Sequence, residues 1–405
     1  MSKKIVVIGG GAAGFFGAIT CARTHPGHSI ILIEKMRQVL AKVRISGGGR
    51  CNVTHSCFDP AQLVSAYPRG GKALLGPFHR FQPRDTIQWF KECDVELKTE
   101  ADGRMFPISN RSETIIQCLM QEAEKAGVVL MRETEVLGIE PGFTVQLKDQ
   151  ESLHADALLL ATGSSKKGYE WAQHLGHRII PPVPSLFTFN IKDERLEDLS
   201  GVSVPHVKLQ IEGTDLKQEG PLLITHWGMS GPAILKLSAW GARILHDLNY
   251  EATLRVNWAP EHKPDQVRAD LQEMRTSRGK KTVWTEILYG LPKNLWKKLI
   301  AAAGIKEERL FAQLSNQELQ GLAAQLTDGR FAISGKSTNK DEFVTCGGIA
   351  LNEVNFQTME SKICPGLYFA GEILDIEGIT GGFNFQNAWT TAWIAGTSML
   401  GTSLP

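Results

Sequence analysis

The chain has 405 residues, of which 42% are hydrophobic and 21% are charged. At about 150 residues per domain this length corresponds to roughly two to three domains, and the composition lies near the average of globular proteins. Collagen-like and largely disordered chains are therefore excluded. The formal net charge is +1, so no overall field draws the protein to nucleic acid or to an anionic membrane. Any basic binding surface has to be local.

Cysteine usage and the start of the chain indicate the compartment. The seven cysteines show no CxxC pair or regular spacing, which predicts neither a disulfide framework nor a metal site. Residues 5–19 are apolar but contain five glycines, and no run elsewhere approaches the ~20 residues of a membrane span. We therefore expect a cytoplasmic protein without a membrane segment.

The first elements form a βαβ unit. Residues 5–8 (IVVI) are a continuous apolar, β-branched run, typical of a strand buried on both faces of a parallel sheet. A helix follows over residues 12–23, Pro26 and Gly27 end it, and residues 29–34 predict a second buried strand. Later segments are expected to extend the same sheet system: a helix over 112–125 and strands over 128–132, 143–147 and 157–161.

The sequence texture changes near residue 190, which indicates an insertion. Short alternating segments there predict a small antiparallel β unit, and residues 262–327 are charged and helical. A texture of strands and glycines returns at residues 344–348. The sequence therefore predicts an α/β fold with a discontinuous first domain. Its expected parts are 1–190 and 341–405 for the first domain, 191–260 for a β-rich insert and 261–340 for a helical insert.

A glycine-rich turn lies between the first strand and the first helix. Its spacing, Gly9-x-Gly11-x-x-Gly14, with an acidic residue at the end of the second strand, is the dinucleotide-binding pattern. Gly11 lets the backbone approach a pyrophosphate, the helix N-terminus presents free N–H groups, and Glu34 accepts hydrogen bonds from an adenosine ribose. The expected nucleotide contacts are Gly9, Gly11, Ala12, Ala13, Gly14, Glu34 and Lys35.

The C-terminal segment favours FAD over NAD as the dinucleotide. Residues 366–372 repeat the pattern of a strand followed by glycine and an acidic residue, and residues 381–384 open an apparent helix. A carboxylate at a strand end can bind ribityl hydroxyls, and helix N–H groups stabilise negative charge near N1 and O2 of a reduced flavin. The expected contacts are Gly371, Glu372, Gly381, Gly382, Phe383 and Asn384.

These motifs resemble those of the YhiN/BaiN-like flavoprotein family, also described as aminoacetone-oxidase-family FAD-binding enzymes. The resemblance covers the whole chain, and it is carried by residues 9–14, 46–52, 106–107, 161–163, 225–232, 358–362 and 366–388. It implies a two-dinucleotide-binding-type Rossmann FAD domain, interrupted by an insert with a β-barrel-like unit and a helical unit. It also implies bound FAD and redox chemistry on a small molecule or a nucleobase.

The resemblance adds further cofactor contacts. Residues 46–52 (SGGGRCN) match a family loop along the cofactor, where successive glycine N–H groups form an anion-binding concavity and Arg50 adds positive charge. The chain departs from the family in a short connection after Gly163 and in Phe383, where the family has tyrosine. The implied contacts are Lys42, Ser46, Gly47, Gly48, Gly49, Arg50, Cys51, Asn52, Val136, Ala161, Thr162 and Gly163.

Direct hydride exchange between flavin and substrate is the chemistry that these motifs predict. A single Rossmann fingerprint and the lack of a CxxC pair argue against a dithiol relay. Two reactions remain: reduction of an activated C=C bond with NAD(P)H as reductant, or oxidation of an amine with oxygen as acceptor. The reaction needs a proton donor or acceptor opposite flavin N5, and the catalytic candidates are His226 and Asp375, with Glu377 nearby in the same motif.

A basic stretch predicts an alternative partner, ribosomal RNA. It runs from Arg275 to Lys298 and includes Trp284 and Trp296, so lysines would meet phosphates while indole rings stack on bases. The alternative function is then a flavin-dependent enzyme that reduces uridine in ribosomal RNA, as the resemblance implies for some relatives. A third hypothesis is a flavin-bound sensor without turnover. No feature of the sequence indicates an oligomeric state.

Overall fold

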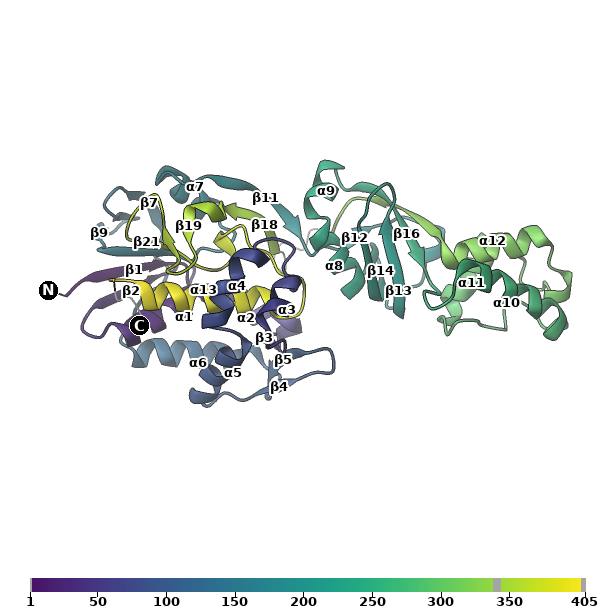
Figure 1. Cartoon of the computed structure of the whole chain (residues 1–405), viewed down its shortest axis with the longest axis horizontal. Helices are drawn as coiled ribbons and strands as arrows, with labels where there is room; N and C mark the ends of the chain where they lie inside the picture. Colours follow the sequence, from purple (N-terminus) through teal and green to yellow (C-terminus); the bar gives the residue numbers. More distant parts are fainter. Residues whose placement is uncertain (1, 338–343, 402–405) are drawn as a thin grey trace. The chain divides into compact units, whose positions relative to one another are not determined.

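The computed structural model describes residues 2–337 and 344–401, and the chain divides into two compact units (Figure 1). Unit 1 consists of Met1–Pro184 and Lys340–Pro405, and unit 2 is the segment Ser185–Asn339. The first domain is therefore discontinuous, as the sequence predicts. The predicted boundary at 340/341 lies outside the described residues, and the boundaries at 190/191 and 260/261 stay predictions.

A seven-stranded sheet is the centre of unit 1. Its strand order is β19-β20-β21-β10-β1-β2-β6, and the pairs from β21 to β6 are parallel. Residues 5–7 are fully buried, because a strand covered on both faces has no solvent side. The strands are β1 (Lys4–Ile8), β2 (Ser29–Ile33), β6 (Val129–Met131), β10 (Ala157–Leu160), β19 (Val354–Asn355), β20 (Glu360–Ser361) and β21 (Leu367–Phe369).

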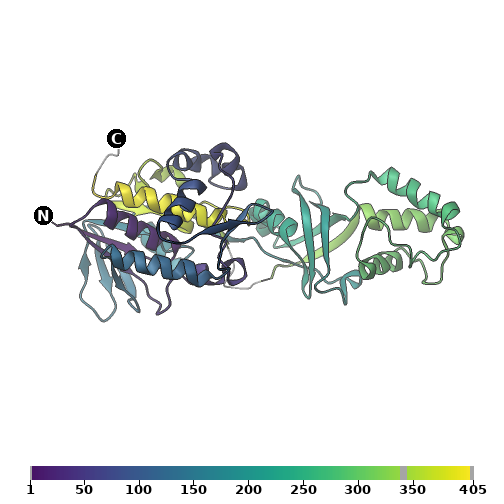
Figure 2. The ribbon, with the colours of Figure 1, turned by 90° about the horizontal axis from the view of Figure 1, so that it is seen from below.

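Two helices from opposite ends of unit 1 pack closely together. Helix α13 runs beside α1 in both views (Figures 1 and 2). An added Cβ at Gly396 would lie 2.7 Å from the carbonyl oxygen of Gly17, so the two backbones meet where neither has a side chain. The helices of unit 1 are α1 (Ala12–Thr24), α2 (Ala41–Gly49), α3 (Pro60–Leu63), α4 (Gly71–Arg80), α5 (Pro83–Glu92), α6 (Ser112–Lys125), α7 (Lys166–His174) and α13 (Phe383–Ser398).

Three smaller sheets complete the described part of unit 1, and one of them corrects a prediction. Residues 143–147 do not extend the main sheet but contribute β8 to a separate antiparallel sheet. Val145 and Leu147 are buried while Gln146 is exposed, and one buried face is typical of a locally paired ribbon. The sheets are β3 (Thr54–His55), β5 (Arg104–Pro107) and β4 (Leu97–Thr99); β7 (Val136–Glu140), β8 (Thr144–Leu147) and β9 (Leu153–His154); and β11 (Ile179–Ser185) with β18 (Val344–Ile349).

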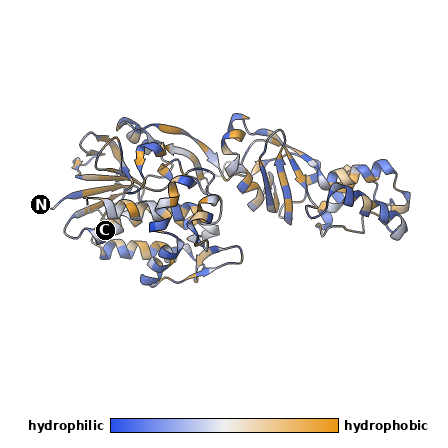
Figure 3. Cartoon of the chain, viewed as in Figure 1, coloured by the Kyte–Doolittle hydropathy of each residue, from blue (hydrophilic) through white to orange (hydrophobic). Residues whose placement is uncertain are grey.

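Unit 2 contains a six-stranded antiparallel sheet and a helical segment. The strand order is β12-β15-β14-β13-β16-β17, and the strands alternate between hydrophilic and hydrophobic residues (Figure 3). The last strand, β17, follows the helical segment. The sequence places these residues in the helical insert, but they pair with β16 of the sheet, because Phe331 and Ile333 are buried in the core. The strands are β12 (Phe189–Asn190), β13 (Ser203–Ile211), β14 (Lys217–Thr225), β15 (Gly228–Ser230), β16 (Glu251–Asn257) and β17 (Gly329–Ser334).

The helices of unit 2 fall into two groups. Two of them follow β15 and pack near the sheet, and three form the segment between β16 and β17. Among the helices of the described residues, none is both long and apolar enough to cross a membrane. The helices are α8 (Pro232–Trp240), α9 (Ala242–Asp247), α10 (Pro264–Ser277), α11 (Lys293–Ala302) and α12 (Asn316–Thr327).

Candidate functional site

The register of the parallel strands brings four predicted contact segments to one edge of the main sheet. Ile8 at the end of β1 pairs with Ile33 of β2 and with Leu160 of β10, and Leu160 pairs with Phe369 of β21. Because parallel strands run in the same direction, the chain leaves all four at the same edge, where open α/β sheets bind ligands. The segments that follow these strands are 9–14, 34–35, 161–163 and 371–372.

The turn between β1 and α1 leaves space that fits a pyrophosphate. An added Cβ would overlap backbone carbonyl groups at Gly9, which has a φ of +114°, and at Gly14. At Gly11, by contrast, an added Cβ would meet nothing within 4 Å. The first turn of α1 carries no acidic side chain, so the N–H groups of Ala12 and Ala13 and the positive helix end remain available to an anion.

Glu34 is held in place by backbone groups on both of its carboxylate oxygens. The Gly10 N–H donates to Oε2 at 2.8 Å, and the Met36 N–H donates to Oε1 at 2.9 Å. A carboxylate oxygen accepts more than one hydrogen bond, so both oxygens can still accept from ribose hydroxyls. The neighbouring Lys35 is exposed. Val136 is buried at the start of β7. It lies close to Glu34 in the chain path, because the N–H of Thr134, two residues earlier, donates to the Glu34 carbonyl oxygen at 3.1 Å.

Two predicted contacts from distant parts of the chain form an ion pair at the end of β21. Lys42 in α2 pairs through Nζ with Glu372 Oε2, and Nζ also donates to Ser164 Oγ at 3.4 Å. The Thr345 N–H donates to Glu372 Oε1 at 3.0 Å. The backbone turns sharply at Gly163 and Gly371, where φ is +60° and +76°. The carboxylate that is predicted to bind ribityl hydroxyls is therefore already oriented.

Two buried hydroxyl groups at this edge lack partners among the described residues. They are Thr162 Oγ1, directly after β10, and Tyr169 Oη in α7. Burial raises the pKa of Tyr169, and the nearby Glu372 and Asp375 carboxylates raise it further, so the side chain is a neutral donor. A buried hydroxyl without a partner is costly, so the pair fits a site that receives a polar ligand such as FAD. Sequence reasoning missed Tyr169; the signal available to it was an aromatic residue directly after the short connection that follows Gly163.

The predicted glycine loop has the geometry of an anion-binding concavity. Gly47, Gly48 and Gly49 all have positive φ, from +58° to +80°, and Ser46 accepts a hydrogen bond from the Cys51 N–H at 3.0 Å. An added Cβ would meet no atom within 4 Å at Gly48 or Gly49, which leaves this backbone open to a ligand. Burial raises the pKa of Cys51 to about 12, so its thiol stays protonated at neutral pH and is not a reactive thiolate.

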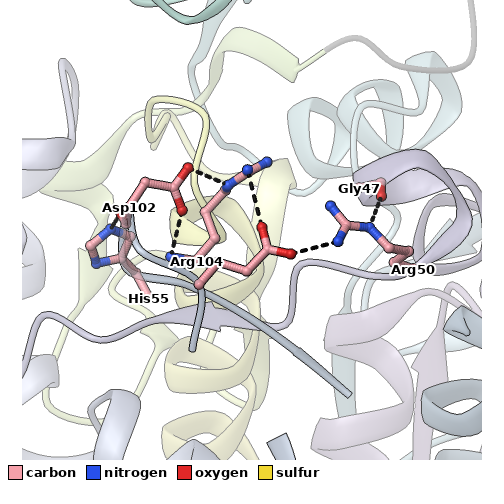
Figure 4. Close-up of polar contacts among 6 residues, drawn as sticks. Gly47, Arg50, His55, Asp102 and Arg104 are labelled. Atoms are coloured by element: carbon pink, nitrogen blue, oxygen red, sulfur yellow. Dashed lines mark hydrogen bonds and ion pairs between the residues drawn. The ribbon is translucent and has the colours of Figure 1, made fainter. Parts of the chain in front are cut away.

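Arg50 at the end of this loop takes part in a network of charges on the neighbouring small sheet (Figure 4). Its Nη1 lies 2.6 Å from Glu100 Oε1, and its guanidinium lies over the Phe106 ring at 4.0 Å from the centroid. Arg104 pairs with the same Glu100 and with Asp102. Glu100 therefore partly neutralises Arg50, and the contact of Arg50 with a pyrophosphate stays a prediction.

The start of α13 is tied to the glycine loop through Asn52. With its amide in the orientation that satisfies both ends, Asn52 accepts from the Gly382 N–H at 2.9 Å and donates to the Thr54 carbonyl. Asn384 both accepts from and donates to the Gly378 backbone. The two amide side chains thus order the protein, and the first N–H groups of α13 remain for a ligand. The Phe383 ring stacks on His55 with centroids 4.7 Å apart.

A family model described as HI0933-like protein Rossmann domain matches residues 3–398. The chain belongs to this HI0933-like family. The finding confirms the resemblance to YhiN/BaiN-like flavoproteins and the Rossmann FAD fold, and it makes the protein an FAD-dependent oxidoreductase. The hypothesis of a sensor without turnover is inconsistent with this finding.

Relatives of this HI0933-like protein match it over nearly their full length. Ribosomal RNA dihydrouridine synthase of Escherichia coli (strain K12) is 31% identical over 98% of this chain and 97% of its own length. The 3-dehydro-bile acid delta(4,6)-reductase of Clostridium scindens is 28% identical over 97% of this chain and 98% of its own. The solved 3-ketosteroid delta1-dehydrogenase from Sterolibacterium denitrificans is 13% identical, with a TM-score of 0.50 over 98% of this chain and 99% of that one, and shows the same fold.

The catalytic residues predicted for this HI0933-like chain lie in different units. Asp375 is half-buried in unit 1, between β21 and α13, and its N–H donates to the Ile349 carbonyl at 3.1 Å. His226 is exposed in unit 2, in the turn between β14 and β15. The structure thus groups Asp375 with the cofactor contacts of unit 1, whereas the role of His226 stays a prediction.

Glu377 is the buried acid of this segment. Its side chain is 0% exposed, and Oε2 lies 2.9 Å from Nη1 of Arg69. Burial raises the pKa of Glu377 to about 7, although the Arg69 charge and a hydrogen bond from Cys346 act in the opposite direction. A carboxyl group of this pKa can hold or release a proton near neutral pH. The sequence motif includes Glu377 as a candidate, but no local pattern around Arg69 indicates that this residue pairs with it.

The predicted RNA-binding stretch is only partly available at the surface. Trp296 is fully buried, and its Nε1 donates to the Val283 carbonyl at 2.9 Å, so its predicted stacking on bases is wrong. The residue belongs to the apolar face of α11, which packs into the helical segment. Trp284 is half-buried and remains within reach of a ligand.

Proposed function

We propose that the protein reduces a C=C bond conjugated to a carbonyl group, and that its substrate is a uridine of ribosomal RNA. The observation that carries this proposal is the match of ribosomal RNA dihydrouridine synthases over both units, at 31% and 30% identity. Making dihydrouridine adds two hydrogens across the C5=C6 bond of uracil, which is conjugated to the C4 carbonyl. The name of the bile acid reductase describes the same kind of bond beside a 3-keto group.

Different residues of unit 1 bind the cofactor and exchange protons in this proposal. FAD, when bound, supplies the hydride chemistry. In this proposal the turn at Gly11 binds the pyrophosphate, Glu34 the adenosine ribose, and the Lys42–Glu372 pair the ribityl chain. The first N–H groups of α13 stabilise negative charge at the isoalloxazine ring. Asp375 exchanges the proton that accompanies hydride transfer, and Glu377 holds a second proton beside it.

The test follows flavin colour first and RNA second. The purified holoenzyme is mixed anaerobically with NADH or NADPH, and bleaching of the flavin identifies the reductant. Ribosomal RNA lacking the modification is then added, and nucleoside mass spectrometry looks for uridine that has gained two hydrogens. We expect dihydrouridine to form only with reductant present, and to form more slowly with Asp375→Asn. A reduced flavin that RNA does not reoxidise, and that is reoxidised only when air is admitted, would contradict the proposal.

A second candidate is reduction of a small enone, favoured by the likeness to the bile acid reductase. The same anaerobic assay distinguishes it, because a 3-keto-4-ene steroid would reoxidise the reduced protein while RNA would not. Amine oxidation, the remaining prediction, requires that an amine bleaches the flavin without any nicotinamide. No feature of the site favours it among the residues that the structure describes.

A further inference from the structure

The helical segment of unit 2 contains a hollow that the reaction chemistry does not use. Its volume is about 410 Å³. It lies between the start of α11 and the loops on either side of that helix. The residues that line it are Thr282, Trp284 and Thr285 before α11, Lys293 and Lys297 in α11, and Glu307 and Glu308 after it.

Backbone hydrogen bonds hold the walls of this hollow together. The Val283 N–H donates to the Arg309 carbonyl at 3.1 Å, and the Phe311 N–H donates to the Lys281 carbonyl at 3.0 Å, so the two loops are paired. The buried Trp296 donates from below to the Val283 carbonyl at 2.9 Å. Trp284 therefore extends from an anchored backbone, which lowers the entropy lost when a ligand binds.

The hollow combines an aromatic face with positive charge and an unused donor. Lys297 Nζ lies 5.4 Å from the centroid of the Trp284 ring. Lys293 lies one helical turn earlier, and neither lysine makes an ion pair with any residue that the structure describes. The indole N–H of Trp284 is buried and finds no acceptor within the same described ranges. A ligand with a planar ring, an acceptor group and negative charge would satisfy all three.

A second hollow in unit 2 lacks these features. It lies over β13, β14 and β16, with a volume of about 530 Å³. Two of its three cations are already paired, Arg255 with Asp328 at 2.6 Å and Lys208 with Glu219 at 3.9 Å; the third is Lys217. No aromatic ring is among the residues that line this sheet face, whereas the Trp284 hollow places a lysine over an indole ring.

We propose that the Trp284 hollow binds a nucleotide of single-stranded RNA. The base stacks on Trp284, the adjacent phosphates meet Lys293 and Lys297, and the carboxylates of Glu307 and Glu308 accept from ribose hydroxyls. This inference rests on the proposed function, because it supplies a contact with the RNA substrate outside the unit that contains the flavin residues. It also limits the expected RNA contacts of the basic stretch Arg275–Lys298 to Lys293, Lys297 and Trp284.

The test measures RNA binding rather than turnover. A fluorescein-labelled single-stranded oligouridylate of about ten nucleotides is titrated with holoenzyme, and anisotropy gives the Kd at several salt concentrations. The Lys293→Glu/Lys297→Glu variant is expected to bind about tenfold more weakly or worse, and to lower the salt slope by about 1.4, at about 0.7 per phosphate contact. Trp284→Ala is expected to bind about fivefold more weakly or worse, whereas Trp284→Phe keeps most of the affinity.

The matched control is Lys280→Glu/Lys298→Glu, which makes the same change in net charge within the same segment but outside the hollow. We expect its Kd and salt slope to stay near those of the unmodified protein. Equal losses in the two double variants would overturn the proposal in favour of general charge attraction, and so would a wild-type holoenzyme that does not bind the oligonucleotide. If either of these binding results is obtained but dihydrouridine still forms in the separate turnover assay, the proposed function holds and only the RNA contact at Trp284 is wrong.

Discussion

Replacing Gly11 by alanine is expected to abolish tight FAD binding while leaving the apoprotein folded. Gly11 has φ of −92° and ψ of −171°, which alanine adopts freely, and its Cβ would meet no protein atom within 4 Å. Alanine loses less unfolded-state entropy than glycine, by about 0.4–1 kcal/mol, but is a poorer N-cap by a similar amount. The free energy of unfolding should therefore change by less than about 1 kcal/mol.

The effect of this methyl group on the cofactor is much larger. Phosphate oxygens accept from backbone N–H groups at about 2.9 Å, and a methyl at this turn occupies the space through which they approach. Each charge-assisted hydrogen bond lost costs about 1.5–3 kcal/mol, so FAD affinity should fall at least about tenfold. The assay is a titration of apoprotein with FAD, followed by quenching of flavin fluorescence, beside urea unfolding of the same apoprotein.

Two other glycines separate this explanation from general damage. A Cβ at Gly14 would overlap the Gly9 carbonyl, so Gly14→Ala should destabilise the apoprotein by about 3 kcal/mol or more. Gly76 is an exposed residue of α4 with open space around it, so Gly76→Ala should slightly stabilise the protein and leave FAD affinity unchanged. Unchanged FAD affinity in Gly11→Ala would refute the placement of the pyrophosphate over this turn.

Three further predictions test other parts of unit 1. Burial raises the pKa of Glu377 to about 7 from an ordinary 4.5, so deprotonation of this side chain destabilises the folded state. The free energy of unfolding of Glu377→Gln, relative to that of the wild type, should therefore rise by up to about 3 kcal/mol between pH 4.5 and 7. A difference that does not change with pH in urea unfolding would contradict this prediction. Glu34→Gln leaves one of two backbone donors without its acceptor and should weaken FAD binding about tenfold in the same fluorescence titration. Trp389→Ala should lower the free energy of unfolding by about 3–5 kcal/mol, because Trp389 is fully buried and donates a hydrogen bond to the Val53 carbonyl. The control is Trp227→Ala, at a side chain that is 69% exposed, which should change the free energy of unfolding by no more than about 0.5 kcal/mol.

The sequence alone determined the parallel strands of the main sheet, and it predicts the edge of that sheet at which the cofactor binds. Residues 5–8, 29–33 and 157–160 are continuous apolar runs, and such runs specify buried parallel strands because the pattern is local. Glycines with acidic residues at the strand ends predict where a dinucleotide binds. The strand over 143–147 pairs with β7 rather than with the main sheet that its pattern predicts, since this partner cannot be inferred from its own residues.

Only the tertiary structure decided which charges and rings come together. Lys42 and Glu372 are 330 residues apart in sequence, and their pairing depends on the sheet order that brings the ends of β2 and β21 to the same edge. The pairing of Arg50 with Glu100 and the half-buried position of Trp284 near the fully buried Trp296 likewise follow from how loops close. Periodicity predicts which face of one element is buried, but a contact between distant elements depends on the path of the chain between them, and no local pattern records that path.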